Sequence, residues 1–153
     1  MKTIANSQLM GKWYSIARTY NRLEMSFQEI FLYVSIGCGS CLELLYVGIK
    51  EDRSKVLKKL DLEILPKDDA CFIVIRKGLF WKKLKILTFD EKEKVLILSD
   101  MKMKHISILS RKPELKHEIV EKCLNGIEAL KGKEVKLYGN SIYETPQSDV
   151  STW

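Results

Sequence analysis

Between residues 12 and 111 the chain is a succession of short β-type runs separated by turn signals, with no helical pattern among them. The runs are rich in Val, Ile, Leu and aromatic residues, which favour strands. Regular spacing of this kind predicts an all-β domain in which antiparallel strands form a barrel or a sandwich. The predicted strands are 12–19, 30–36, 42–49, 56–65, 71–76, 83–89, 95–99 and 105–110.

The hydrophobic period changes to that of a helix after residue 112. Pro113 fits the first turn of a helix, Gly132 fits the position just past its end, and apolar residues between them recur every three or four positions. We therefore expect a helix at about 113–131, a last strand at about 135–139 and a polar tail at about 145–153. With 153 residues, the chain has the length of a single domain spanning 1–153.

Two motifs, at the start and the end of the strand region, resemble those of the lipocalin family. Gly11-Lys12-Trp13 is similar to the GxW signature of the first lipocalin strand, and residues 108–113, Ile-Leu-Ser-Arg-Lys-Pro, are similar to the segment that ends the last barrel strand. Residues 22–24 and 78–81 resemble loops of the bacterial, outer-membrane lipoprotein type of lipocalin. The resemblance covers about residues 8–145. It implies an eight-stranded antiparallel up-and-down β-barrel (the lipocalin calyx) at about 11–112, with a C-terminal α-helix packed on the outside and a short ninth strand.

The resemblance also implies structural roles for Gly11, Trp13 and Arg111. Trp13 would fill the closed end of the barrel, and the Arg111 guanidinium would lie on its indole, a cation–π contact worth about 0.5–2 kcal/mol. Gly11 would allow the backbone to approach closely before the first strand begins.

An eight-stranded barrel is just wide enough to hold one small ligand. Side chains alternate between the inside and the outside of each strand, and Trp13 and Arg111 set the phase of the first and last barrel strands. This alternation does not show which residues of the seventh strand, 95–99, face inward. It predicts a mostly aliphatic cavity, with Arg76 and His105 as its polar candidates near the mouth. The predicted ligand-binding residues are Ala17, Leu32, Val34, Leu44, Tyr46, Leu62, Phe72, Val74, Arg76, Leu84, Ile86, His105, Ser107 and Leu109.

The charge is unevenly placed along the barrel axis. The net charge of +6 alone is compatible with nucleic acid, a membrane surface or an anionic ligand. In a meander the loops alternate between ends, and the open-end loops 21–29, 49–55, 76–83 and 100–105 carry ten basic and five acidic residues, or +5. The closed-end loops 37–41, 66–70 and 90–94 carry three and five, or −2.

A basic mouth that is also rich in Met and aromatic residues indicates a function. It predicts the binding and transport, without catalysis, of a small hydrophobic anionic lipid such as a fatty acid or a lysophospholipid. The rim would also make transient contact with an anionic membrane surface. No nucleic-acid surface and no cofactor are expected, and the oligomeric state is left open.

Catalytic and metal-binding patterns are sparse in this sequence. No Ser/His/Asp order, paired inward carboxylates, phosphate loop or metal-ligand spacing is visible. Alternation places Cys71 on the outer face of its strand, which argues against a cysteine-based site inside the barrel. Cys38 and Cys41 are interpreted as hairpin-turn thiols. A lipocalin-fold enzyme that acts on a lipophilic substrate is the alternative function.

The N-terminal ten residues contain neither the apolar core nor the cleavage site of a secretory leader. As written, the chain is expected to be cytoplasmic. If a leader was removed, it is expected to be periplasmic or associated with the outer membrane.

Overall fold

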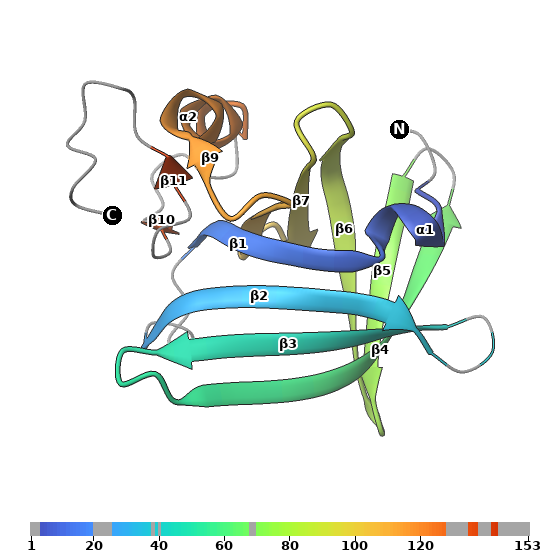
Figure 1. The fold of residues 1–153 in the computed structure, drawn as a ribbon. Coiled ribbons are helices and arrows are strands. Elements are labelled where there is room, and N and C mark those ends of the chain that lie inside the picture. Colours follow the sequence, from blue (N-terminus) through green and yellow to red (C-terminus); the bar gives the residue numbers. More distant parts are fainter. Residues whose placement is uncertain are drawn as a thin grey trace.

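Eight antiparallel strands follow one another around a closed barrel (Figure 1). The computed structural model describes residues 4–19, 26–37, 39, 41–67, 70–127, 135–137 and 142–143. Each strand pairs with the next along the chain, and β8 pairs with β1 to close the barrel, which confirms the predicted fold. The barrel strands are β1 (Gly11–Thr19), β2 (Phe27–Ile36), β3 (Leu42–Lys50), β4 (Lys55–Lys67), β5 (Ala70–Lys77), β6 (Phe80–Asp90), β7 (Val95–Asp100) and β8 (Ile106–Ser110).

Alternation along the strands builds the inner core of the barrel. In β4, for example, Leu60, Leu62 and Ile64 pack into the inner cluster, while Asp61 and Glu63 between them are exposed. The inner cluster is continuous across β1 to β8 and also includes Leu9 of the short helix α1 (Asn6–Leu9). The inward-facing side chains of the barrel strands therefore form its apolar interior.

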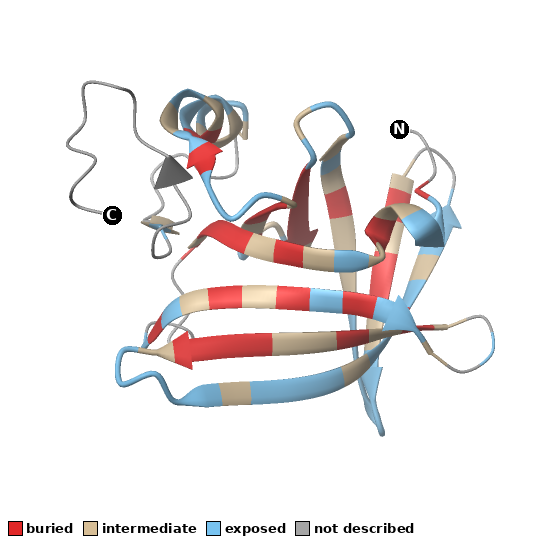
Figure 2. Ribbon diagram, viewed as in Figure 1, coloured by how far each residue is buried: buried red, intermediate tan, exposed pale blue. Residues whose placement is uncertain are grey.

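Three barrel strands are buried on both faces because a helix covers their outer side. The helix α2 (His117–Asn125) lies outside the barrel beyond β1 (Figure 1). Val120 of α2 packs in an outer cluster with side chains of β1, β7 and β8, such as Ile16, Ile97 and Ile108. Figure 2 shows this double burial as nearly continuous red along β7.

The helix begins at His117 instead of at the predicted residue 113. The preceding residues form a short strand, β9 (Leu115–Lys116), which pairs in parallel with β11 (Ile142–Tyr143), and the Leu115 side chain is buried. A ninth strand on the barrel, β10 (Val135–Leu137), pairs with residues 17–19 of β1. The helix ends at Asn125, with Gly126 as its C-cap, before the predicted end at about 131. Residue 131 itself, the rest of the last strand beyond 137 and the polar tail lie outside the described residues.

Register shifts interrupt three of the strand pairings. They fall between Ser15 and Ala17 in β1, between Phe27 and Glu29 in β2, and between Ile86 and Thr88 in β6. A bulge of this kind puts two neighbouring residues where one would normally stand, so the alternation of faces changes phase beyond it. These shifts decide which side chains reach the interior near the strand ends.

No helix among the described residues is long and apolar enough to cross a membrane.

Candidate functional site

The barrel encloses a cavity of about 230 Å³ whose lining comes from all eight strands and α1. Trp13 and Leu9 lie at its closed end, and Thr19, Lys82, Asp100 and His105 lie toward the opposite end. The connections β3–β4, β5–β6 and β7–β8, together with the end of β1 at Thr19 and the start of β2 at Phe27, surround this second end, which is the mouth of the barrel.

The closed end is built from Gly11, Trp13 and Arg111. The Trp13 indole is 1% exposed, and its N–H donates to the Leu9 carbonyl oxygen over 2.9 Å. The Arg111 guanidinium lies 3.9 Å from the centroid of the indole and donates to the carbonyl oxygens of Gln8 (2.7 Å) and Lys12 (3.2 Å). Burial lowers the pKa of Arg111, and the guanidinium nevertheless remains charged at any ordinary pH.

Gly11 provides the space for this arrangement. Its φ is +104°, and a Cβ at this position would lie 2.9 Å from Nη1 of Arg111. Both observations explain why a residue without a side chain stands at the start of β1. Trp13 and Arg111 thus hold each other and the backbone of residues 8–12 in place.

Aliphatic side chains form most of the cavity wall. They project from the inward positions of consecutive strands, which is why they succeed one another at intervals of two residues. Tyr46 of β3 is the aromatic member of the wall above Trp13. The apolar lining consists of Leu9, Trp13, Leu32, Val34, Leu44, Tyr46, Leu60, Leu62, Ile73, Ile75, Leu84, Leu96, Leu98, Ile106 and Leu109.

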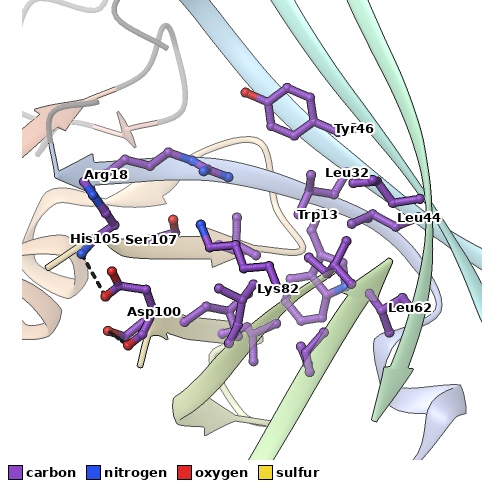
Figure 3. A pocket seen from close by; sticks show the side chains of 18 of the residues that line it. Trp13, Arg18, Leu32, Leu44, Tyr46, Leu62, Lys82, Asp100, His105 and Ser107 are labelled. Carbon is purple, nitrogen blue, oxygen red and sulfur yellow. Dashed lines mark hydrogen bonds between the residues drawn. The ribbon is translucent and has the colours of Figure 1, made fainter. Parts of the chain in front are cut away.

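Polar side chains gather on one side of the mouth. Figure 3 shows Arg18, Lys82, Asp100, His105 and Ser107 together on this side, whereas leucines of β2 to β4 lie on the other. The Arg18 Nε donates to Ser15 Oγ over 2.9 Å. Three basic side chains thus share the cavity lining with a single carboxylate, among the residues that the structure describes.

The Asp100 carboxylate is held by the turn that follows β7. Its Oδ1 accepts the backbone N–H groups of Lys104 (2.7 Å) and His105 (3.1 Å), the second of which is dashed in Figure 3. Burial acts to raise the pKa of Asp100. The two backbone hydrogen bonds, together with the charges of His105 and Lys82, outweigh burial and hold the pKa below its ordinary value. The Asp100 carboxylate is therefore ionised and hydrogen-bonded to the backbone of the β7–β8 turn.

Phe27 stands at the start of β2, at the mouth end of the barrel. Its ring occupies the space above Gly48, where a Cβ would lie 2.7 Å from the ring, and it packs with Ile30 and Val56. The ring centroid of Phe27 is 6.4 Å from that of Tyr46. The Phe27 ring therefore fills the space that the absence of a side chain at Gly48 leaves.

Most of the predicted ligand-binding residues lie in the cavity wall. One further residue, Ile86, is fully buried in the inner cluster without lining the cavity. The predicted residues that line the cavity are Leu32, Val34, Leu44, Tyr46, Leu62, Leu84, His105, Ser107 and Leu109.

Ala17 does not line the cavity, because the bulge in β1 changes the phase of alternation. Both Ile16 and Ala17 face the outer cluster under α2, and the next residue, Arg18, turns into the barrel. The sequence carries no signal for this bulge, so Arg18 was missed for the same reason that Ala17 was misplaced.

The phase predicted for β5 was wrong by one residue. Leu62 of β4 faces Ile75 directly, so the inward face of β5 carries Ile75 and Ile73. Phe72, Val74 and Arg76 therefore lie outside the cavity, and Arg76 is exposed. Residues 71–75 are apolar on both faces, which removed the alternation that would have fixed the phase.

The same inversion moves Cys71 to the inside of the barrel. It is fully buried in the inner cluster, next to the β4–β5 connection at the closed end. It does not line the cavity, and His105 lies at the other end. Among the described residues, no group of three His, Cys, Asp or Glu side chains could hold a metal ion.

Other lining residues were missed for different reasons. Leu96 and Leu98 belong to β7, which is apolar on both faces, so its phase could not be predicted. Lys82 could have been found, because it stands two residues before the inward Leu84.

Comparison with known proteins supports the architecture. No protein-family model matches the chain, and no curated protein matches it in sequence. Several solved structures do match it. The cockroach allergen Per a 4 superposes with a TM-score of 0.69 at 13% identity, covering 91% of this chain and 92% of the allergen. Insecticyanin from the tobacco hornworm Manduca sexta gives 0.67 at 17% identity, covering 94% and 89%. Lobster apocrustacyanin A1 gives 0.61 at 20% identity, covering 88% and 78%.

These structures define the class of fold. The closed eight-stranded barrel, the outer helix and the additional strand are those of a lipocalin. At such low identity the likeness establishes the lipocalin fold and nothing finer.

Proposed function

We propose that the protein binds and carries one small hydrophobic molecule with an anionic head group inside its barrel. The observation that carries this proposal is the cavity itself, which is aliphatic at depth and has Arg18, Lys82 and His105 at its mouth. An apolar chain would lie among the leucines, and its head group would meet the basic side chains. The motifs at 22–24 and 78–81 further suggest that the chain is a lipocalin of the bacterial, outer-membrane lipoprotein type.

The size of the cavity favours a ligand with one acyl chain. Its volume of about 230 Å³ lies just under the range of about 300–1,000 Å³ that is usual for pockets that bury a drug-sized ligand. One chain fits such a space, whereas a two-chain lipid would not. Fatty acids and lysophospholipids are the matching classes.

The arrangement at the mouth favours an anionic head over a neutral one. A carboxylate or phosphate gains charge-assisted hydrogen bonds from guanidinium and ammonium groups. The only carboxylate in the described lining, Asp100, already accepts two backbone N–H groups. The basic side chains therefore dominate what an entering head group meets.

The groups in the cavity support binding without catalysis. His105 and Cys71, which a cysteine-based mechanism would pair, lie at opposite ends of the barrel. Cys71 is also covered by the inner cluster, away from the cavity surface.

Affinity measurements with two ligands of equal chain length test the proposal. Dodecanoate and dodecanol share one apolar tail and differ in the charge of the head, and displacement of a fluorescent fatty acid reports the binding of both. We expect dodecanoate to bind at least about tenfold more tightly, because a hydrogen bond to a charged group contributes about 1.5–3 kcal/mol. Equal affinities would refute the anionic head, and no binding of either ligand would refute the whole proposal.

Variants of two neighbouring lysines separate the mouth from the surface. Lys82 lines the cavity, whereas Lys83 lies on the outer face of β6, with its Nζ 4.3 Å from the centroid of the Phe72 ring. Lys82→Ala and Arg18→Ala should each weaken dodecanoate binding several-fold and leave dodecanol binding unchanged. Lys83→Ala should change neither affinity. A loss of dodecanol binding in Arg18→Ala would show instead that Arg18 supports the shape of the cavity.

A further inference from the structure

The hairpin between β5 and β6 exposes three consecutive large apolar side chains. Leu79 at the tip is 101% exposed, and Phe80 and Trp81 are 59% and 65% exposed. Gly78, at φ +58°, forms the tight turn that brings Leu79 to the tip. Contiguous exposed apolar surface marks an interaction site more often than chance placement, since folded domains ordinarily bury side chains of this size.

The same hairpin carries a concentrated positive charge. Residues 76–83 contain Arg76, Lys77, Lys82 and Lys83 and no acidic residue, and every charged residue between 70 and 89 is basic. Arg76, Lys77 and Lys82 are exposed. The apolar tip is thus flanked by basic side chains on both strands, and Figure 2 colours the end of β5 as exposed.

Cross-strand pairing mixes the two kinds of side chain on both faces of the hairpin. Trp81 stands opposite Arg76, and Phe80 stands opposite Lys77. Directly opposite residues point to the same side of a sheet, so each face presents one aromatic ring and one cation. Aromatic rings that settle at a lipid interface beside basic side chains that reach anionic head groups are a pattern suited to a membrane surface.

The hairpin is also joined directly to the mouth of the cavity. Ile75 and Lys82, on the two strands of the hairpin, both line the cavity. The pairing of β6 with β7 begins only at Leu84, opposite Asp100, so residues 80–83 extend past the end of β7. A surface that bound the tip would therefore lie beside the cavity entrance.

We propose that the β5–β6 hairpin tip docks the protein onto an anionic lipid bilayer, with Leu79, Phe80 and Trp81 in the interface and the flanking basic residues on the head groups. Docking would place the mouth of the cavity at the membrane, where a single-chain lipid could enter or leave. This role in lipid transfer rests on the proposed function, whereas the docking itself does not. A second copy of this chain is a poorer occupant, because two hairpins of the same strong positive charge would repel each other.

Co-sedimentation with vesicles tests the docking. The probes are vesicles of phosphatidylcholine alone and vesicles of phosphatidylcholine mixed with phosphatidylglycerol. We expect the protein to bind the mixed vesicles and not the neutral ones, with binding that weakens as salt is added. Phe80→Ser/Trp81→Ser should weaken binding more than about tenfold, since each buried aromatic side chain contributes about 1.5–3 kcal/mol. Arg76→Ala should weaken it about fivefold, because each basic residue near an anionic surface contributes about 1 kcal/mol.

Matched controls lie elsewhere on the barrel. Leu57→Ser removes an apolar side chain that is 61% exposed on β4, and Lys92→Ala removes an exposed cation at the closed end. Neither should change vesicle binding. Equal binding to both vesicle types, no binding to either, or an equal loss in a control would overturn the proposal. So would a dimer in sedimentation velocity that Phe80→Ser/Trp81→Ser abolishes, because the tip would then be a self-interface.

Fatty-acid binding separates this proposal from the function of the cavity. Phe80 and Trp81 do not line the cavity, so the double variant should bind dodecanoate as the wild type does. Loss of vesicle binding with unchanged dodecanoate affinity and thermal stability supports docking. Wild-type protein that binds anionic vesicles but no dodecanoate would refute the cavity proposal and leave docking standing.

Discussion

The two ends of the barrel use cationic side chains in opposite ways. At the closed end, Arg111 lies on the Trp13 indole and donates to two backbone carbonyl oxygens, so protein groups engage it on several sides. At the open end, Lys82 and His105 line a cavity while remaining exposed to solvent. A cation whose partners come from the protein itself contributes to packing, whereas the cations at the open end face space that the proposed ligand would occupy.

Replacing a tryptophan at each end should produce the largest difference. Trp13→Ala removes a buried side chain and leaves a cavity under Arg111, which should lower the free energy of unfolding by about 3–5 kcal/mol. Trp81→Ala removes a ring that is 65% exposed and should change it by less than about 0.5 kcal/mol. Urea unfolding followed by circular dichroism measures both. Similar losses in the two variants would contradict the division of the barrel into a structural and a functional end.

Alanine substitutions at two glycines test how much the close contact between Gly11 and Arg111 contributes to stability. Gly11→Ala should lower the free energy of unfolding by about 1–3 kcal/mol, because it strains a positive φ and its Cβ meets Arg111. Gly39→Ala is the control, since Gly39 has φ +65° but nothing lies within 4 Å of its added Cβ. Its loss should be about 1 kcal/mol, the cost of backbone strain alone. If Gly39→Ala costs as much as Gly11→Ala, the contact with Arg111 contributes nothing.

The sequence predicts the closed end better than it predicts the open end. Trp13 and Arg111 belong to motifs whose order and spacing are specific, and both occupy the places that the resemblance implied. The all-β class follows from the succession of strands, because each strand is long enough and regular enough to be recognised, whereas the closed barrel was implied by the resemblance. Inward positions are predicted well wherever one face is polar, as at Leu62 between Asp61 and Glu63.

Prediction fails where the alternation itself disappears. In β5 the run Cys71–Ile75 is apolar on both faces, so nothing in the sequence distinguishes inside from outside. In β7 the helix α2 covers the outer face, which makes both faces apolar for a physical reason that only the tertiary structure supplies. In β1 a bulge places Arg18 in the cavity lining where regular alternation would have placed Ala17. The lining therefore gains a cation in place of a small apolar side chain. Arg18 on the basic side of the cavity could therefore not be predicted from the sequence, whereas His105 and Ser107 on the same side were predicted.

Asp100 is the one carboxylate in the described cavity lining. Replacing it should have the smallest effect of the three tests, and it should lower stability while it strengthens ligand binding. Its pKa is lowered in the folded protein, so its carboxylate contributes stability that is fully present above the unfolded pKa of about 4 and is lost as pH falls through the lower folded value. Asp100→Asn keeps an oxygen that can accept the N–H groups of Lys104 and His105 but removes the charge. The variant should therefore be slightly less stable than the wild type at pH 6, and the difference should vanish in strongly acidic solution.

The same substitution should strengthen dodecanoate binding a few-fold, because it removes the one carboxylate of the described cavity lining, which would repel the head group. Urea unfolding across the acidic range and fluorescent-ligand displacement at pH 6 measure the two effects. Glu63→Gln, at an exposed position on the outer face of β4, removes one negative charge away from the mouth and should leave the affinity unchanged. If Asp100→Asn weakened dodecanoate binding, the carboxylate would be orienting the basic groups, and the open end would depend on an internal partner in the same way as the closed end.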